Sequence, residues 1–386
     1  MSMDGHAYIV GAYEHPLRRA PDKSTAQLHA EVAAGALADA GLTFGDVDGY
    51  FCAGDAPGFG PMSMMDYMNI NPRYVDTTET GGSSYLVHVG HAARAILSGQ
   101  CNVALITLAG RPRSEGGAVR TATFGPQPDL IWEEPFGPRV VSLYALCAQR
   151  HMYEFGTTSE QLAWIKVTAS HHAQHNPNAM LRDVVTVQDV LDSPMISDPL
   201  HRLDCCVVSD GGGALVVTRE AIARSLSRPL VRVIGAAEAL QHQSGGYPEL
   251  VASAARQSGQ RAFAEAVVTP ADIRYASIYD SFTITVLIQL EDLGFCEKGQ
   301  GGRFVSDGAL IANVGRLAIN TDGGGLCSNH PGHRGGMTKI IEAVRQLRGE
   351  AHPAVQVRDC ALAVAQGTGG AMGTRHGSGT LIMERV

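Results

Sequence analysis

The sequence carries little charge for its length. Asp, Glu, Lys and Arg together make up 18% of its 386 residues, whereas about 25% is usual. The formal net charge is −8, and lysine and arginine form no cluster of the kind that phosphate binding needs, so nothing favours a nucleic-acid partner. Because 45% of the residues are hydrophobic, disorder is excluded, and we expect a large core with part of the surface buried in an oligomer.

Long apolar segments are also missing. The longest runs, such as residues 103–109, are far too short to span a bilayer, and residues 1–6 lack the basic stretch and apolar run of a secretory signal. The eight cysteines show no pairing pattern and stand at positions 52, 101, 147, 205, 206, 296, 327 and 360. We therefore expect reduced thiols, no membrane span and a cytoplasmic location.

Short runs of Val, Ile and Leu alternate with longer amphipathic runs. This alternation predicts an α/β fold whose strands are covered on both faces. Ser24 with Gln27, and Thr158 with Gln161, have the spacing of a capping box at a helix start. The pattern predicts strands at residues 7–12, 103–109, 213–218, 230–236, 275–280, 361–365 and 379–383, and helices at 24–40, 84–97, 142–153, 158–176, 283–293 and 336–347.

A faint internal repeat predicts two similar halves. Residues 36–47 match residues 262–273 in character, and upstream residues 9–12 are echoed by residues 233–236. Each copy has the pattern of a strand that ends in Gly-Ala, then a helix, an acidic turn and another strand. The predicted division is 1–225, with a loop insertion at about 110–200, and 226–386.

The densest candidate site is a glycine-rich segment at residues 320–336. Three glycines at 323–325 allow tight turns and close approach to a ligand, and His330 and His333 follow just before a predicted helix start. The pattern is typical of a functional loop, although a glycine-rich turn with surface histidines would have the same sequence.

This segment resembles the catalytic-histidine loop of the thiolase superfamily. Asn320, two further residues, paired glycines and a His-Pro-x-x-x-Gly motif that begins at His330 match that loop. The resemblance covers most of the chain, and its other matches lie at residues 193–203, 209–212, 278–282, 290–296 and 367–371. It implies a thiolase fold, in which two similar βαβαβ-type halves form a layered α-β-α-β-α core, and a homodimer. It also implies a catalytic role for His330 and contact with substrate at Asn320, Gly324, Gly369 and Gly370.

One departure from the family concerns the nucleophile. Thiolases place a cysteine at the start of a buried helix, where the helix dipole favours the thiolate. Here that position falls on Gly82, and residues 80–85 contain no cysteine. Ser83 or Ser84 could replace it only with an adjacent base. We therefore expect the backbone of Gly82, Ser83 and Ser84 to contact the substrate or its oxyanion.

A second departure concerns the acid/base residues. Where sterol-carrier-protein thiolases have a histidine and a cysteine, this chain has Tyr279 and Ser281. It thus resembles the cysteine-free lipid-transfer-protein aldolases of steroid side-chain degradation, whose Tyr-Asp-x-Phe motif matches at Tyr279. That resemblance implies a β-hydroxyacyl-CoA substrate, no cofactor or metal besides this CoA, and a small OB-fold, zinc-ribbon partner in a two-plus-two assembly. A second tyrosine of that branch falls on His330, which leaves open whether Tyr279 or His330 is the base.

We therefore predict a lyase that releases a ketone or aldehyde and a shorter acyl-CoA by a retro-aldol step. Tyr279 would take the β-hydroxyl proton directly or through water, and His330 would stabilise the thioester enolate, supported by Ser281 and His333. Two alternatives remain, a Claisen-type acyltransferase and a catalytically silent acyl-CoA or lipid-binding subunit. The sequence does not identify the acyl group.

Several histidines have a structural explanation beside a functional one. The first group of histidines comprises His171, His172 and His175. A polar helix end explains this group more simply than a zinc site does. His88 and His91 follow Ser83 at helical spacing. They point either into the site or to a surface or dimer interface.

Two further features fall in the first half. Cys205 and Cys206 lie among apolar neighbours, and we expect them to be buried. The loop at residues 110–117 and the proline-rich segment at 125–138 are expected to cover a ligand tunnel or to contact a partner.

Overall fold

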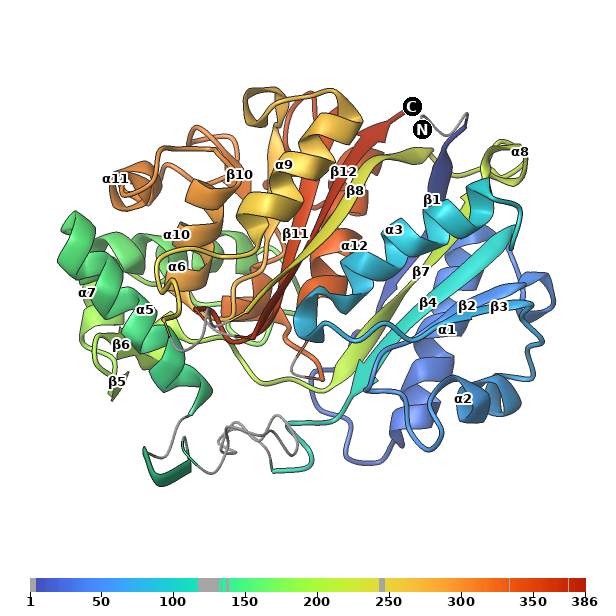
Figure 1. The fold of residues 1–386 in the computed structure, drawn as a ribbon, viewed down its shortest axis with the longest axis horizontal. Coiled ribbons are helices and arrows are strands. Elements are labelled where there is room, and N and C mark those ends of the chain that lie inside the picture. Colours follow the sequence, from blue (N-terminus) through green and yellow to red (C-terminus); the bar gives the residue numbers. More distant parts are fainter. Residues whose placement is uncertain are drawn as a thin grey trace.

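The computed structural model describes residues 5–116, 132, 134–136, 139–242, 247–332, 334–373 and 375–386. Most of the predicted covering segment at 125–138 lies outside these ranges. A ten-stranded mixed sheet runs through the described chain in the order β10-β9-β11-β12-β8-β1-β7-β4-β2-β3 (Figure 1).

The strands of the sheet divide into two sets of five. The first set is β1 (Ala7–Glu14), β2 (Gly49–Phe51), β3 (Tyr74–Asp76), β4 (Val103–Gly110) and β7 (Gly211–Arg219). The second set is β8 (Val231–Gln241), β9 (Tyr275–Ile278), β10 (Ala318–Ile319), β11 (Leu362–Gly370) and β12 (His376–Arg385). A separate two-stranded sheet pairs β5 (Met195–Ser197) with β6 (Leu200–His201).

The two sets mirror each other about the centre of the sheet. Outward from β1 the neighbours are β7, β4, β2 and β3, and outward from β8 they are β12, β11, β9 and β10. In both sets the first two pairings are antiparallel and the last two are parallel. This symmetry confirms the prediction that the chain contains two similar halves. The halves share one sheet because β1 pairs with β8 over a few residues.

The helices follow the same division. The first half has α1 (Thr25–Ala40), α2 (Pro61–Met68), α3 (Ser84–Leu97) and α8 (Glu220–Ala223). Between β4 and β7 lie α5 (Val140–Phe155), α6 (Ser159–Ala173) and α7 (Val187–Leu191). The second half has α9 (Ala255–Ala266), α10 (Thr283–Asp292), α11 (Gly301–Val305) and α12 (Gly336–Arg348). None of the helices in the described ranges has both the length and the apolar character needed to cross a bilayer.

The predicted strands and helices are all present. The side chains of Ser24 and Thr158 cap α1 and α6 by accepting the backbone N–H groups of Gln27 and Gln161. Helix α6 is shorter than predicted and ends at Ala173, because the chain turns there ahead of a proline. Among the elements absent from the predicted ranges, α2, β2, β3 and β10 are too short to show a period, whereas α9 has 12 residues.

The internal repeat corresponds to matching strand–helix contacts. A Cβ atom on Gly11 of β1 would overlap the carbonyl oxygen of Ala36 in α1, and a Cβ atom on Gly235 of β8 would overlap that of Ala262 in α9. Glycine is therefore needed at both positions so that each helix can lie close against its strand. The two halves thus use the same packing at equivalent residues.

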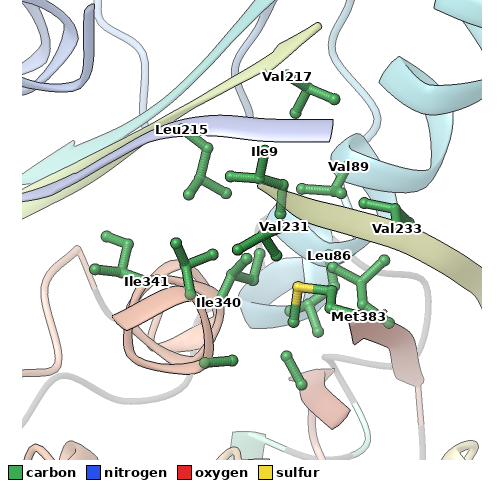
Figure 2. Close-up of a cluster of buried hydrophobic side chains, with 14 of the residues drawn as sticks. Ile9, Leu86, Val89, Leu215, Val217, Val231, Val233, Ile340, Ile341 and Met383 are labelled. Atoms are coloured by element: carbon green, nitrogen blue, oxygen red, sulfur yellow. The ribbon is translucent and has the colours of Figure 1, made fainter. Parts of the chain in front are cut away.

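Three apolar cores separate the layers. Helices α3 and α12 lie between the two halves of the sheet, α1 and α2 cover the outer face of the first half, and α9 and α10 cover that of the second, together with α5 and α6 (Figure 1). This is the predicted α-β-α-β-α order. Figure 2 shows the central core, to which both half-sheets and both central helices contribute Ile9, Leu86, Val89, Leu215, Val217, Val231, Val233, Ile340, Ile341 and Met383.

The two central helices begin side by side. A Cβ atom on Gly336, the first residue of α12, would overlap the backbone oxygen of Gly82 just before α3. A Cβ atom on Gly367 of β11 would lie 3.2 Å from Cα of Ser83. The start of α3, the start of α12 and the end of β11 therefore meet at one place, and several of the predicted site residues lie there.

Candidate active site

The site centres on a contact between Tyr279 and His330. Tyr279 directly follows β9, and His330 follows a π-helical turn at Gly324–Ser328. The Tyr279 Oη atom lies 2.9 Å from His330 Nε2, and the two rings are nearly perpendicular at 82°. The exposed fractions of the two residues are 5% and 7%. The structure thus brings together the two residues that the sequence proposed as acid/base groups.

The phenol of Tyr279 occupies the space in which a side chain at position 82 would lie. A Cβ atom on Gly82 would be 2.5 Å from Tyr279 Oη, 2.6 Å from its Cε2 and 2.5 Å from the carbonyl oxygen of Thr368. Real Cβ atoms do not approach other atoms so closely. Only glycine fits beside this tyrosine.

The burial and the hydrogen bonds of Tyr279 indicate its protonation state. Burial raises the pKa of Tyr279 well above its usual value, and the backbone N–H of Gly335, 3.1 Å from Oη, opposes this only in part. The phenol is therefore neutral at physiological pH. Because an N–H group can only donate, the phenol oxygen accepts the Gly335 hydrogen bond, and its own proton is available for His330 or a substrate.

His330 is held through its backbone. Its N–H donates to Ser209 Oγ at 2.9 Å, and Ser209 Oγ donates to Asn329 Oδ1 at 2.5 Å. Ser209 belongs to the segment at 209–212 that resembles the thiolase core strand and its approach. These contacts fix the histidine loop against the segment before β7.

An ion pair beneath the site supports the π-helical turn. Asp280 accepts the N–H groups of Gly325 at 2.8 Å and Leu326 at 3.2 Å, and lies 2.6 Å from Lys339 Nζ. Burial lowers the pKa of Lys339, but the negative charges around it, above all that of Asp280, raise it overall. Both side chains are 1% exposed. The Asp280–Lys339 pair therefore connects Tyr279, the turn and α12.

Asn320 and Gly324 have clear roles within the fold. The Asn320 amide accepts the N–H of Ile278 and donates to its carbonyl oxygen, both at 2.8 Å, which extends the pairing of β9. Gly324 has a φ of 60°, and a Cβ atom there would overlap the carboxylate of Asp280. These two residues shape the site, and their contact with substrate stays a prediction.

Ser83 and Ser84 form the turn that begins α3. Ser83 Oγ donates to the carbonyl oxygen of Thr80 at 2.7 Å, and Ser84 Oγ donates to that of Gly81 at 2.8 Å. Ser84 Oγ also accepts the N–H of Thr80 at 2.9 Å. Both hydroxyls thus donate to backbone oxygens, so the contribution that remains open to these residues is that of their backbone.

The terminal glycine loop borders the same turn. A Cβ atom on Gly81 would lie 2.9 Å from Cα of Gly369, so these two backbones touch. Gly370, with a φ of 74°, begins the connection from β11 to β12. The predicted roles of Gly369 and Gly370 at the substrate are not tested by these contacts. His333, the remaining predicted site residue, lies outside the described residues.

Tyr144 is a site neighbour that the sequence analysis missed. It lies in α5, contacts Phe282 with ring centroids 4.5 Å apart and ring planes tilted by 34°, and shares a hydrogen bond with Ser281. Burial raises the pKa of Tyr144 to about 12. Ser281 Oγ also lies 3.0 Å from Thr285 Oγ1. No motif marks Tyr144, because α5 comes from the insertion between β4 and β7.

The cysteines do not provide a nucleophile. All eight are free, and burial raises the pKa of each thiol above its usual value. Cys205 and Cys206 are half-buried, not buried as expected. Their segment does not enter the sheet, because Cys205 forms only an isolated β-bridge with Phe282, just before α10. A protonated thiol is a poor nucleophile, so no cysteine has the character of a thiolase nucleophile.

The remaining histidines have structural contacts away from Tyr279. His172 is buried, and its Nε2 accepts the N–H of Ala312 at 2.9 Å. His88 Nε2 contacts the Thr78 carbonyl oxygen at 2.9 Å, and His91 lies between two carboxylates. In the described part of the chain, no three potential metal ligands lie close enough together to hold an ion.

Comparison with known proteins identifies the family. A family model described as "Thiolase C-terminal domain-like" matches residues 236–385. The chain is 34% identical to the 17-hydroxy-3-oxo-4-pregnene-20-carboxyl-CoA lyase of Mycobacterium tuberculosis, over 90% of this chain and 92% of that protein. It is 31% identical to an acetyl-CoA acetyltransferase of Methanothermobacter thermautotrophicus, over 95% of this chain and 97% of that protein.

A solved structure resembles the chain in detail. It is an Ltp2-ChsH2(DUF35) aldolase with a TM-score of 0.89 and 31% sequence identity, and the match covers 99% of this chain and 98% of that one. The sequence motifs and the mirrored halves agree with these similarities. The chain therefore belongs to the thiolase superfamily, in the sterol-carrier-protein-thiolase-like branch that contains the steroid side-chain-cleaving aldolases.

Proposed function

We propose that the chain is a lyase that cleaves a β-hydroxyacyl-CoA into a ketone or aldehyde and a shorter acyl-CoA. One observation carries this proposal: the phenol of Tyr279 fills the side-chain space at position 82 and contacts His330. An acid/base pair thus stands where thiolases hold a nucleophile. Such a pair serves proton transfer and carbon–carbon cleavage, and it forms no acyl-enzyme.

The proton steps follow from the hydrogen bonds. Tyr279 is neutral, so it can accept the β-hydroxyl proton of the substrate only as it passes its own proton to His330 Nε2, 2.9 Å away. His330 is then the final base of a two-residue relay. As the substrate oxygen forms a carbonyl, the bond between Cα and Cβ breaks and its electrons form the thioester enolate. Return of the proton through Tyr279 to Cα releases the shorter acyl-CoA.

The enolate needs hydrogen-bond donors on the side opposite the base. We assign these to the backbone N–H groups of Gly82 and Ser83, at the start of α3, because the Ser84 N–H already donates to the carbonyl oxygen of Gly81. The positive end of a helix dipole favours a developing negative charge there. CoA enters as part of the substrate, and the proposed steps need no other cofactor.

The names of the relatives favour a steroid side-chain thioester as substrate. We also propose a homodimer and an OB-fold, zinc-ribbon partner. The aldolase structure similar to this chain is named for two components. The cytoplasm is the proposed location, since all eight cysteines are free.

An acyltransferase is the second candidate, because a similar archaeal protein is named acetyl-CoA acetyltransferase. The raised pKa of every thiol argues against its covalent form. A radiolabelled acyl-CoA separates the two. Label that stays on the chain would support acyl transfer, and a lyase leaves none.

The experiment that tests the lyase proposal is Tyr279→Phe. The change keeps the ring and removes only the hydroxyl, so we expect kcat for retro-aldol cleavage to fall by about 10²- to 10⁴-fold. Tyr153→Phe is the matched control, because Tyr153 is 82% exposed on α5. Product formation from a β-hydroxyacyl-CoA would be followed for both variants. Undiminished turnover by Tyr279→Phe would remove this tyrosine from the mechanism.

A further inference from the structure

An ion pair joins the two loops that enclose the Tyr279 phenol. Arg334 Nη2 donates to Glu79 Oε2 at 2.8 Å, and Glu79 Oε1 accepts the N–H of Gly81 at 2.7 Å. Glu79 precedes α3 and Arg334 precedes α12, so the contact spans 255 residues of sequence. We call this contact, between Glu79 and Arg334, the latch.

The latch lies next to both backbone positions that touch the phenol. Gly82 stands three residues after Glu79, and its backbone packs so closely against the phenol that a Cβ atom there would overlap Tyr279 Oη. Gly335 directly follows Arg334, and its N–H donates to Tyr279 Oη at 3.1 Å. A shift of Arg334 relative to Glu79 would therefore alter the slot that holds the phenol.

One end of the latch is anchored in the core. Arg334 Nη1 lies 3.5 Å from Asp55 Oδ1, which accepts the Tyr85 hydroxyl at 2.5 Å, while Asp55 Oδ2 accepts the N–H of Ala109 at 3.1 Å. The Asp55 side chain is 4% exposed, whereas that of Glu79 is 41% exposed. Asp55 thus holds the Arg334 guanidinium against β4 and α3. The other partner of Arg334, Glu79, lies at the surface.

We propose that Arg334 and Glu79 are positioning residues that hold the Gly335 N–H on the Tyr279 hydroxyl. The inference rests on the proposed function only in that Tyr279 is taken to be catalytic. Without the latch, the loop before α12 moves, the Gly335 hydrogen bond weakens and the phenol loses its alignment with His330. Misplacement of a reacting group by about 1 Å can cost up to about 100-fold in rate.

Hydrogen exchange at the Gly335 amide tests the latch without any turnover. We expect slow exchange in the unmodified chain and exchange faster by about fivefold to tenfold in Arg334→Gln, the effect of one hydrogen bond. Tyr279→Phe, which removes the acceptor, should show the same increase. Arg224→Gln is the control, because Arg224 pairs with Glu220 on the surface of α8 and should leave exchange at Gly335 unchanged.

Glu79→Gln keeps the inference testable if Arg334→Gln fails to fold. It retains an oxygen for the Gly81 N–H and replaces Oε2, which accepts from Arg334 and from the Gly54 N–H, with an amide nitrogen that cannot accept. We expect kcat for both variants to fall by about tenfold or more with little change in KM. The double variant should be no slower than the worse single variant, because both remove one interaction.

The outcomes separate the latch from the proposed reaction. Unchanged exchange at Gly335 in both Arg334→Gln and Glu79→Gln would overturn the latch, whatever the activity. Faster exchange in a chain that cleaves no β-hydroxyacyl-CoA would leave the latch in place and contradict the proposed function.

Discussion

At the scale of single residues, Gly82 and Tyr279 depend on each other. The backbone of Gly82 leaves room for the phenol, and the phenol fills the space of any larger residue 82. A cysteine at this position would overlap Tyr279, so the phenol and any side chain at residue 82 exclude each other.

Gly82→Ala tests this dependence. A methyl group there would lie 2.5 Å from Tyr279 Oη, so we expect a loss of about 1–3 kcal/mol of stability and a large loss of retro-aldol turnover. Gly45→Ala is the matched control, because the nearest atom to a Cβ at Gly45 is 3.6 Å away. Denaturant unfolding and turnover would be measured for both. Full activity of Gly82→Ala would show that the phenol has space to spare.

At this scale the sequence predicted the residues that belong to motifs. Tyr279 and His330 were identified because each lies in a segment with family-like spacing, and they are in contact. Tyr144 and Lys339 were missed because each reaches the site from a helix without a motif, and Arg334 was missed because it occupies a variable position of the His-Pro-x-x-x-Gly motif. Their roles depend on tertiary packing, and no local pattern encodes it.

At the scale of elements, local chemistry explains much of the fold. Capping residues and apolar periods predicted the long helices and strands, and the Gly11 and Gly235 contacts explain why the repeat persists in two places. The short strands β2, β3 and β10 were not predictable. Three residues or fewer carry no period, and neighbouring strands stabilise them.

His91 forms ion pairs that connect α3, β3 and β8, and their contribution to stability depends on pH. It lies in α3, 2.7 Å from Asp76 of β3 and 3.0 Å from Glu238 of β8. Hydrogen bonds with Asp76 and then Glu238 raise the pKa of His91 to about 9. Because the pKa is about 6.5 in an unfolded chain, this contribution is fully present below about pH 6.5 and is lost as the pH rises through about 9.

His91→Gln should therefore destabilise the protein at about pH 6 and have little effect at about pH 10. Glutamine keeps hydrogen-bonding ability and cannot carry the positive charge. The free energy of unfolding in denaturant would be compared for the variant and the unmodified chain across this range. A difference between them that does not depend on pH would contradict the charged form of His91.

At the scale of the whole molecule, the first half ends in an edge strand of the sheet, β3. Strand β3 ends the sheet order, and no strand in the described ranges pairs with its outer side. Such an edge is a natural place for a second copy to bind. The sequence predicted the two halves from their repeat. It could not show that the halves share one sheet, because the β1–β8 pairing leaves no local signal.

Sedimentation tests the proposed homodimer. We expect a dimer at micromolar concentration, with β3 at its interface. Val75→Lys places a charge on that strand, where the side chain is 40% exposed, and should favour the monomer. Val314→Lys is the control, because Val314 is 77% exposed in the second half. A monomeric unmodified chain, or a dimer insensitive to Val75→Lys, would move the interface elsewhere or remove it.

The most direct test of the reaction itself is to incubate the chain, with its proposed partner, with a β-hydroxyacyl-CoA and to analyse products and protein together by mass spectrometry. Acid/base cleavage through Tyr279 and His330 predicts equal amounts of a ketone or aldehyde and a shorter acyl-CoA, with no acyl group bound to the protein. An acyl adduct on the chain, or products of acyl transfer without the carbonyl compound, would contradict it.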